Sequence, residues 1–247
     1  MVIDILKVVE TAKLAGRAIA DIYKKDFEVE YKDDSSPLTE ADKEANRIIV
    51  TELKKLYPSI PILSEEGRSI DYNERKNWEL FWLIDPLDGT KEFIKKNGEF
   101  TVNIALVKNQ IPIAGVVYAP VLQECYYAKE GEGAYRDGVK LPLKKDGNYR
   151  VVASKSHRTP ETDEFIDSLK LKHKDLEIVS KGSSLKLCMI ASGEADIYPR
   201  LAPTMEWDTA AAHAVVSQSG KRVYEYGTKK ELVYNKQDLL NPWFVVE

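Results

Sequence analysis

The segment LFWLIDPLDGTKEF, residues 80–93, constrains the fold of this chain more than any other stretch. Its first five residues are apolar and typical of a buried β-strand. The strand ends at Asp85, and after a proline the chain adds a second carboxylate at Asp88, followed by a glycine and a threonine. A core strand that delivers two acids into one tight turn suggests that this edge of a sheet carries chemistry.

Two carboxylates held this close repel each other when both are ionised and shielded from water, unless a raised pKa, solvent or a cation relieves the repulsion. Carboxylate and carbonyl oxygens are the hard ligands that Mg²⁺ prefers. If a helix begins at TKEFIKK, the N–H groups of Gly89 and Thr90 face an anion. The turn is then a candidate metal–phosphate site. The alternative is a plain Asp-Gly turn, which we do expect at Asp137-Gly138.

Composition places the 247-residue chain among ordinary globular proteins, with 43% hydrophobic and 31% charged residues. A formal charge of −4 offers no general attraction to nucleic acid. Cys125 and Cys188 lack CxxC spacing, which favours reduced, buried thiols. Asp4 and Glu10 interrupt the apolar core of a signal peptide, and no stretch reaches the roughly 18 apolar residues of a membrane span. We expect a cytoplasmic protein; peripheral residence at the inner face of the membrane and a homodimeric state stay open.

Hydrophobic periodicity predicts a chain of mixed helices and strands. Helices are expected at residues 3–23, 39–56, 160–170, 184–192 and 208–218. Strands are expected at 28–32, 60–66, 80–84, 151–153, 176–179 and 195–198, and as an antiparallel series at 101–107, 111–120 and 124–128 with a turn at Asn109-Gln110. The polar segment 137–150 separates the antiparallel series from the later region, where short strands alternate with helices. We therefore predict an N-terminal α+β domain (1–145) and a C-terminal α/β domain (146–247).

Four segments, in order along the chain, carry a resemblance to a known family. WLIDPLDGT (82–90) resembles the signature of the inositol monophosphatase superfamily of Mg²⁺-dependent, lithium-sensitive phosphatases. SSPLTEADKEA (35–45), ILSEE (62–66) and EWDTAAAHAVV (206–216) resemble three further segments of that superfamily. The resemblance spans about residues 5–220 and implies a layered αβαβα sandwich. Most metal ligands would then lie in the N-terminal part, and the last Asp ligand and the substrate selectors in the C-terminal part.

The resemblance also implies a role for each matching residue. Two or three Mg²⁺ ions would be held by Glu65, Asp85, Asp88, Asp208 and the carbonyl of Leu87. A water molecule activated by these ions would be oriented by Glu65 and Thr90, with Asp42 supporting Thr90. The amides of Gly89 and Thr90 would stabilise the phosphate oxygens. No covalent phosphoenzyme is implied.

Structural alternatives to these roles stay open. Thr39 and Asp42 have the spacing of a capping box, which one helix start can combine with a catalytic role. Glu66 is a weaker candidate ligand beside Glu65. Asp208, after Trp207, could serve as a helix N-cap.

The C-terminal half favours one branch of the superfamily, the 3′(2′),5′-bisphosphate nucleotidases. In KGSSLKLCMIASGEADIYPR and ASKSHRTPE, the residues Ser183, Lys186, Arg200 and His157 are placed as in that branch, where they contact the nucleoside and a second phosphate. Leu87, Asp88, Gly89, Thr90 and Asp208 would contact the phosphate to be removed. The implied reaction converts adenosine 3′,5′-bisphosphate to AMP and phosphate, which clears a by-product of sulfate assimilation.

Each of these assignments has a competitor. Lys186 could be a solvated helix residue, Arg200 could form a surface ion pair, and His157 could be an ordinary surface histidine. For the whole protein, the nearest rival is an inositol monophosphatase or fructose-1,6-bisphosphatase with the same metals. A rival of another class is a non-catalytic nucleotide-binding regulator, which would be free to lose acidic ligands that are all present here.

We predict that Asp88→Asn abolishes turnover while the fold survives. The substitution removes a proposed ligand, and it also removes one negative charge from a crowded set, which relieves repulsion in the metal-free protein. Turnover with Mg²⁺ and the melting temperature without metal measure the two effects. A large drop in the metal-free melting temperature would contradict this prediction.

Overall fold

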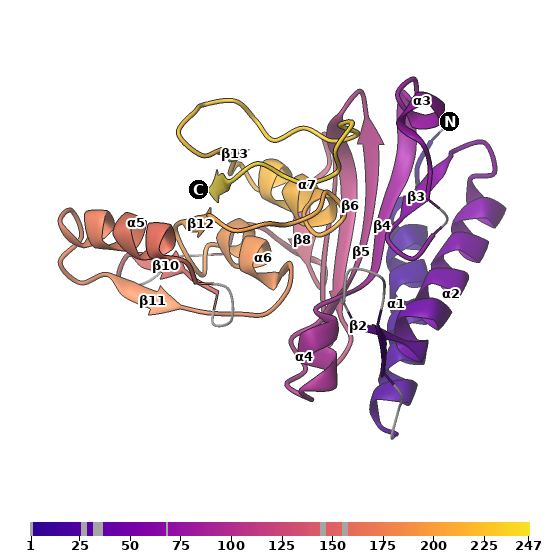
Figure 1. Cartoon of the computed structure of the whole chain (residues 1–247), viewed down its shortest axis with the longest axis horizontal. Helices are drawn as coiled ribbons and strands as arrows, with labels where there is room; N and C mark the ends of the chain where they lie inside the picture. The colour runs from indigo at the N-terminus through magenta and orange to yellow at the C-terminus, as the bar shows by residue number, and fades with distance from the viewer. Residues whose placement is uncertain (1, 26–28, 32–36, 68, 144–146, 155–157) are drawn as a thin grey trace.

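The chain folds into alternating layers of helices and sheets (Figure 1), as seen in a computed structural model that describes residues 2–25, 29–31, 37–67, 69–143, 147–154 and 158–247. From one side to the other, the layers are two long helices, a large mixed sheet, two shorter helices, a smaller set of strands and one outer helix. The layered αβαβα sandwich that the resemblance implies is confirmed.

The large sheet has seven strands in the order in which they follow along the chain. They are β3 (Ile62–Ser64), β4 (Leu80–Asp88), β5 (Thr101–Lys108), β6 (Ile111–Ala119), β7 (Glu124–Lys129), β8 (Gly133–Arg136) and β9 (Val139–Lys140). β3 runs parallel to β4, and every later neighbour is antiparallel. Two of the hairpin turns fall at residues with positive φ, Asn109-Gln110 and Asp137-Gly138, as the sequence predicts.

Two long helices cover one face of this sheet: α1 (Ile5–Tyr23) and α2 (Glu40–Leu56). Each is amphipathic and begins at a residue whose side chain accepts a backbone N–H, Asp4 for α1 and Thr39 for α2. Side chains alternate along β4, so Trp82 and Ile84 pack against α1 and α2 in one apolar cluster. Phe81 and Leu83 face the opposite side of the sheet. The short pair β1 (Val29–Tyr31) and β2 (Pro37–Thr39) leads into α2.

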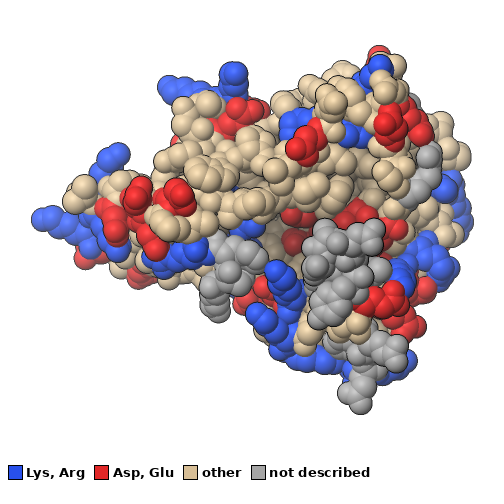
Figure 2. Space-filling view, in the orientation of Figure 1, with Lys and Arg blue, Asp and Glu red and all other residues tan. Residues whose placement is uncertain are grey.

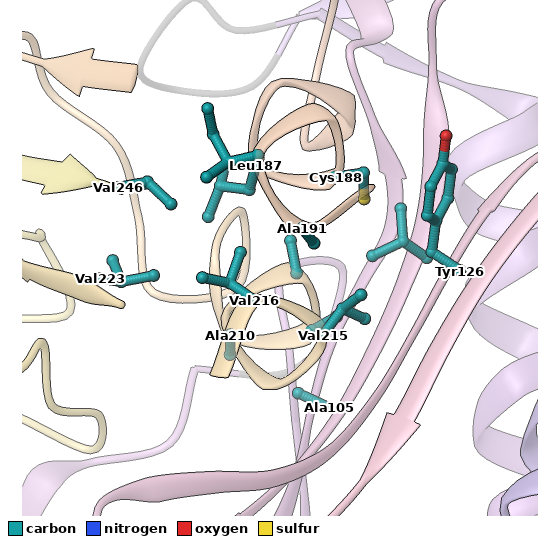
Figure 3. Close-up of a cluster of buried hydrophobic side chains, with 14 of the residues drawn as sticks. Ala105, Tyr126, Leu187, Cys188, Ala191, Ala210, Val215, Val216, Val223 and Val246 are labelled. Atoms are coloured by element: carbon teal, nitrogen blue, oxygen red, sulfur yellow. The ribbon is translucent and has the colours of Figure 1, made fainter. Parts of the chain in front are cut away.

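The other face of the sheet is covered by α6 (Leu185–Ser192) and α7 (Ala210–Gln218). Figure 3 shows side chains of both helices between sheet residues such as Tyr126 and the small-sheet residues Val223 and Val246. Because these helices lie between two layers, they are apolar on nearly all sides. Cys188 lies in this cluster and Cys125 in the cluster under α1; both thiols are buried and free, as expected.

The last two layers are smaller. Their strands are β10 (Arg150–Val152), β11 (Glu177–Val179), β12 (Tyr198–Arg200), β13 (Val223–Glu225) and β14 (Phe244–Val246). β10 pairs with β11 in parallel, β14 lies between β12 and β13, and a bridge between Val151 and Ile197 joins the two sets. The outer helix is α5 (Pro160–Lys170), which begins and ends where the sequence predicts.

Several elements differ from the sequence prediction. The polar segment 137–150 was expected to separate two domains, but its first part forms β9 of the large sheet. The sequence did not predict β8, β13, β14 or the short α3 (Tyr72–Arg75), while α4 (Thr90–Ile94) does begin at the expected residue. The largest apolar cluster draws residues from both sides of residue 145. The division into two domains at that residue stays a prediction.

Within the described part of the chain, no helix combines the length and the apolar character needed to cross a membrane.

We predict that Gly115→Ala destabilises the protein by about 1–3 kcal/mol, the usual cost of overpacking a core. Gly115 lies on β6 directly under α7, and a Cβ there would stand 2.2 Å from the carbonyl oxygen of Ala211. Urea unfolding measures the change. The control is Ile111→Val at the exposed start of the same strand, which should change stability by no more than about 0.5 kcal/mol; equal effects of the two substitutions would contradict the prediction.

Candidate active site

A bulge in β4 brings both acids of the opening segment to the same face of the sheet. Asp85 pairs with Asn103 and Asp88 pairs with Thr101, so three steps along β4 match two along β5. In a regular strand, residues three apart point to opposite faces, and the bulge supplies the extra residue that reverses this. Asp85 and Asp88 therefore both face the layer of α6 and α7, although Pro86 and Leu87 separate them.

Two further carboxylates reach the same edge from distant parts of the chain. Glu65 follows β3, and because β3 is parallel to β4, its end lies beside Asp85; the Glu65 N–H donates to the carbonyl of Ile84 at 3.1 Å. Asp208 precedes α7 on the opposite layer. One carboxylate oxygen of each of Glu65, Asp85 and Asp208 lies within 4.8 Å of the others. Such a set of hard oxygen atoms can hold a divalent cation.

Asp208 is positioned by its own turn and does not cap α7. Its Oδ2 accepts a hydrogen bond from the backbone N–H of Met205 at 2.9 Å, and the N-cap of α7 is Thr209, whose side chain makes no capping bond. The N-cap role that the sequence left open for Asp208 is therefore wrong. The turn places one carboxylate oxygen of Asp208 within 4.8 Å of an oxygen of Glu65 and of Asp85.

The site is electrostatically strained without a cation. Burial, followed by the charges of Glu65, Asp88 and Asp208, raises the pKa of Asp85 well above its usual range. Burial and the charge of Asp88 do the same to the pKa of Asp208. The pKa of Asp88 rises to about 6, mainly through burial, although the Lys186 ammonium and the N–H of Ser184 oppose the rise. A bound cation would relieve all three shifts at once.

Asp42 caps a helix and also contacts the site. Its Oδ2 accepts bonds from the N–H and the hydroxyl of Thr39, at 2.8 and 2.5 Å, while the Thr39 hydroxyl accepts from Ala41. This completes the capping box at the start of α2. The other oxygen, Oδ1, accepts from the hydroxyl of Thr90 at 3.3 Å. The two roles that the sequence left open for Asp42 thus fall on different oxygens of one buried carboxylate.

The acidic cluster and Thr90, but not Asp42, line a cavity of about 530 Å³. Figure 2 shows acidic side chains in the hollow in the middle of this face and basic side chains below it. The predicted site residues that line the cavity are Glu65, Asp85, Leu87, Asp88, Gly89, Thr90, Ser183, Lys186, Arg200 and Asp208. Lys91, Lys95 and Lys181 also line it. His157 lies outside the described residues.

Lys186 is buried, so the alternative of a solvated helix lysine is wrong. Its ammonium donates to the carbonyl of Ser183 at 2.7 Å and to that of Lys181 at 3.4 Å, which holds the turn before α6. Burial lowers the pKa of Lys186 to about 8, and the nearby charge of Asp88 opposes that shift. The ammonium therefore both shapes the turn and balances part of the negative charge of the cluster.

Arg200 ends β12 and lines the cavity, where its charge opposes the rise in the pKa of Asp208. One of its terminal nitrogens donates to the carbonyl of Pro203 at 2.8 Å. Its Nε is buried and has no hydrogen-bond partner among the residues that the structure describes. A buried donor without a partner is costly. The residue as a whole is half-buried and lines the cavity, so its guanidinium could also meet an anionic group of a ligand.

Three residues that the sequence analysis did not single out hold Asp88 in place. The N–H of Ser184 donates to Asp88 Oδ2 at 2.6 Å, and the hydroxyl of Ser184 contacts Thr101 and Asn103 at 2.8 and 2.9 Å. Thr101 and Asn103 are buried polar residues in the otherwise apolar strand TVNIALV. Two polar side chains at alternate positions of a core strand were a signal that this face of the strand meets a polar site.

Comparisons with known proteins agree with this geometry. A model of the inositol monophosphatase family matches residues 4–243, and the chain belongs to this family. The chain is 44% identical to the 3′(2′),5′-bisphosphate nucleotidase CysQ of Salmonella typhimurium, over 97% of this chain and 98% of that protein. It is 37% identical to the CysQ nucleotidase of Haemophilus influenzae, over 94% and 88%.

Solved structures show the same fold. The crystal structure of CysQ from Bacteroides thetaiotaomicron, described as a bacterial member of the family, has a TM-score of 0.90 and 47% identity, over 98% of this chain and 96% of that one. An inositol monophosphatase from Thermotoga maritima has a TM-score of 0.80 and 25% identity, over 97% and 90%. The recognition made from the four sequence segments is confirmed.

We predict that the metal-free protein loses stability as pH rises through about 6. In the unfolded chain an Asp carboxyl titrates near pH 4. The raised pKa of folded Asp88 therefore contributes stability below about pH 4 that is lost as pH passes its folded pKa of about 6. Asp88→Asn has no such loss, so without metal its melting temperature should exceed that of the wild type by a few degrees more at about pH 7.5 than at about pH 5. Calorimetry with EDTA measures this; an advantage that does not grow with pH would contradict the assignment.

Proposed function

We propose that this protein is a 3′(2′),5′-bisphosphate nucleotidase that removes the 3′-phosphate of adenosine 3′,5′-bisphosphate, giving AMP and phosphate. The observation that carries the proposal is a cavity lined both by the acidic cluster and by the cationic side chains of Lys186 and Arg200. A substrate with two phosphates matches both sets of groups. The name of the relatives at 44% identity supports the same substrate.

The acidic cluster suits Mg²⁺, because its donors are all oxygens and its carboxylates repel one another without a cation. Glu65, Asp85 and Asp208 would hold a first ion, and Asp88 with the carbonyl of Leu87 would complete sites for two or three ions. When bound, the ions supply a water molecule of lowered pKa and neutralise the charge of the phosphate.

The residues of the chain then orient the reaction. Glu65 and Thr90 direct the attacking water, and Asp42 Oδ1, which accepts from the Thr90 hydroxyl, fixes the position of that hydroxyl. The water oxygen forms a bond to phosphorus as the bond from phosphorus to the ribose oxygen breaks, and a proton from the water, net, ends on the ribose oxygen to give the 3′-hydroxyl. The N–H groups of Gly89 and Thr90 donate to the phosphate oxygens that gain charge. The two thiols take no part, since both are buried and burial raises the pKa of each.

The second phosphate is proposed to bind at Arg200, with Lys186 and the turn at Ser183 beside it. A hydrogen bond from a charged donor contributes about 1.5–3 kcal/mol, enough to favour a bisphosphate over a monophosphate about tenfold or more. Clearing a by-product of sulfate assimilation in the cytoplasm is the role proposed with this substrate.

We predict that the purified protein with Mg²⁺ prefers adenosine 3′,5′-bisphosphate to inositol 1-phosphate and fructose 1,6-bisphosphate. Arg200→Met should raise KM for the adenosine bisphosphate about tenfold while kcat changes less, because it removes binding to the phosphate that does not react. Phosphate release measures both. A clear preference for inositol phosphate would replace the proposed substrate, and no hydrolysis of any ester would favour the non-catalytic regulator. Lys181 is another cation that lines the cavity, and Lys181→Met serves as the comparison variant.

A further inference from the structure

A buried glutamate with no role in the chemistry above lies next to the acidic cluster. Glu206 comes two residues before Asp208 and is fully shielded from solvent. Its Oε2 accepts from the N–H of Asn235 at 2.6 Å, and its Oε1 accepts from the N–H and the ammonium of Lys236 at 2.9 and 2.7 Å. A buried carboxylate with both oxygens engaged fixes the backbone segments that it joins.

The segment that Glu206 binds is held from its other side by Arg75, at the end of α3. The buried guanidinium donates to the side-chain oxygen of Asn235 at 2.8 Å and to the carbonyls of Lys236 and Gln237 at 2.6 and 2.9 Å. The side-chain amide of Asn235 donates back to the carbonyl of Arg75 at 2.8 Å. Asn235 has a φ of +67°, a left-handed conformation in which asparagine is enriched. That conformation lets one residue serve Glu206 and Arg75 at once.

These contacts join the segments that carry the three clustered carboxylates. α3 lies in the connection from β3 to β4, between Glu65 and Asp85 in the chain, whereas Glu206 lies in the turn that carries Asp208. A second set of bonds supports the same turn: Met205 bridges to Leu240, and the side-chain amide of Asn241 donates to the carbonyl of Met205 at 2.8 Å and to the Thr209 hydroxyl at 3.0 Å.

Asp208 faces the carboxylates of Glu65 and Asp85 within 4.8 Å, so these contacts hold its turn against the repulsion of two like charges. We propose that Glu206 is a positioning residue of the metal site: with Lys236, Asn235 and Arg75, it holds Asp208 close enough to Glu65 and Asp85 for the three to share one divalent cation. This inference rests on the proposed function, since the cation is the one that the reaction requires.

The test is Glu206→Gln, which keeps the volume of the side chain but loses the ion pair with Lys236. Residues that orient metal ligands typically change metal affinity by about 10- to 100-fold. We expect the dissociation constant for Mn²⁺, measured on the protein alone by electron paramagnetic resonance, to rise by about that factor. The Mg²⁺ concentration for half-maximal hydrolysis should rise in parallel, while kcat at saturating Mg²⁺ changes by less than about threefold.

Arg75→Lys is the second variant, because it keeps the charge but loses the forked bonds, and it lies outside the residues that line the cavity. Arg75→Lys should also raise the dissociation constant for Mn²⁺. This variant tests the proposal if Glu206→Gln does not fold. The matched control is Glu194→Gln, which removes the ion pair of Glu194 with Arg136, a pair that is also absent from the cavity lining. Its Mn²⁺ affinity should match that of the wild type.

Three outcomes would overturn the inference. Folded Glu206→Gln and Arg75→Lys proteins that bind Mn²⁺ as the wild type does would show that the contacts do not position the site. An equal loss in Glu194→Gln would assign the effect to general stability. A wild type that binds no Mn²⁺ and hydrolyses no ester would remove the proposed function as well, which separates that failure from the first two.

Discussion

Repulsion between carboxylates that the backbone forces together is the constraint on which this structure depends. The bulge in β4 turns Asp85 and Asp88 to one face, and the parallel strand β3 sets Glu65 beside them. Buried charges of one sign are tolerated only where neighbouring groups offset them. The N–H of Ser184 and the ammonium of Lys186 are such partners for Asp88, whereas the carboxylate of Asp42 adds to the negative charge around Asp85, and the clustered carboxylates could hold a cation.

The layer of α6 and α7 both completes the core and completes the site. The same helices that fill the space between the two sets of strands begin at the residues that face the cluster, Ser184 before α6 and Asp208 before α7. Close contact between this layer and the large sheet, visible at Gly115, therefore sets how far Asp208 stands from Asp85. Stability of the core and geometry of the site are therefore linked through this interface.

Much of the fold could be predicted from local patterns. The helices α1, α2 and α5 and the antiparallel series β5 to β7 follow periodicity, caps and turn residues, all of which are local. The strands β13 and β14 could not be predicted in this way, because each is three residues long and is defined by pairing with a strand from another part of the chain. The site divides similarly: the acids of β4 stand out in the sequence, and Thr101 and Asn103 signal a polar face, but only the tertiary structure shows that Ser184 lies against them.

The sequence by itself determined the chemistry that the chain carries: which acids end strands, where a helix is capped, and which family these segments resemble, because these depend on residue type and on spacing within a few residues. Only the tertiary structure decided that one oxygen of Asp42 accepts from Thr39 and the other from Thr90. It also decided that Asp208 accepts from Met205 and is not an N-cap, and that Lys186 is buried. Each of these depends on which distant segment packs against the residue. Distances across layers are set by the packing of whole helices on sheets, and no local pattern records them.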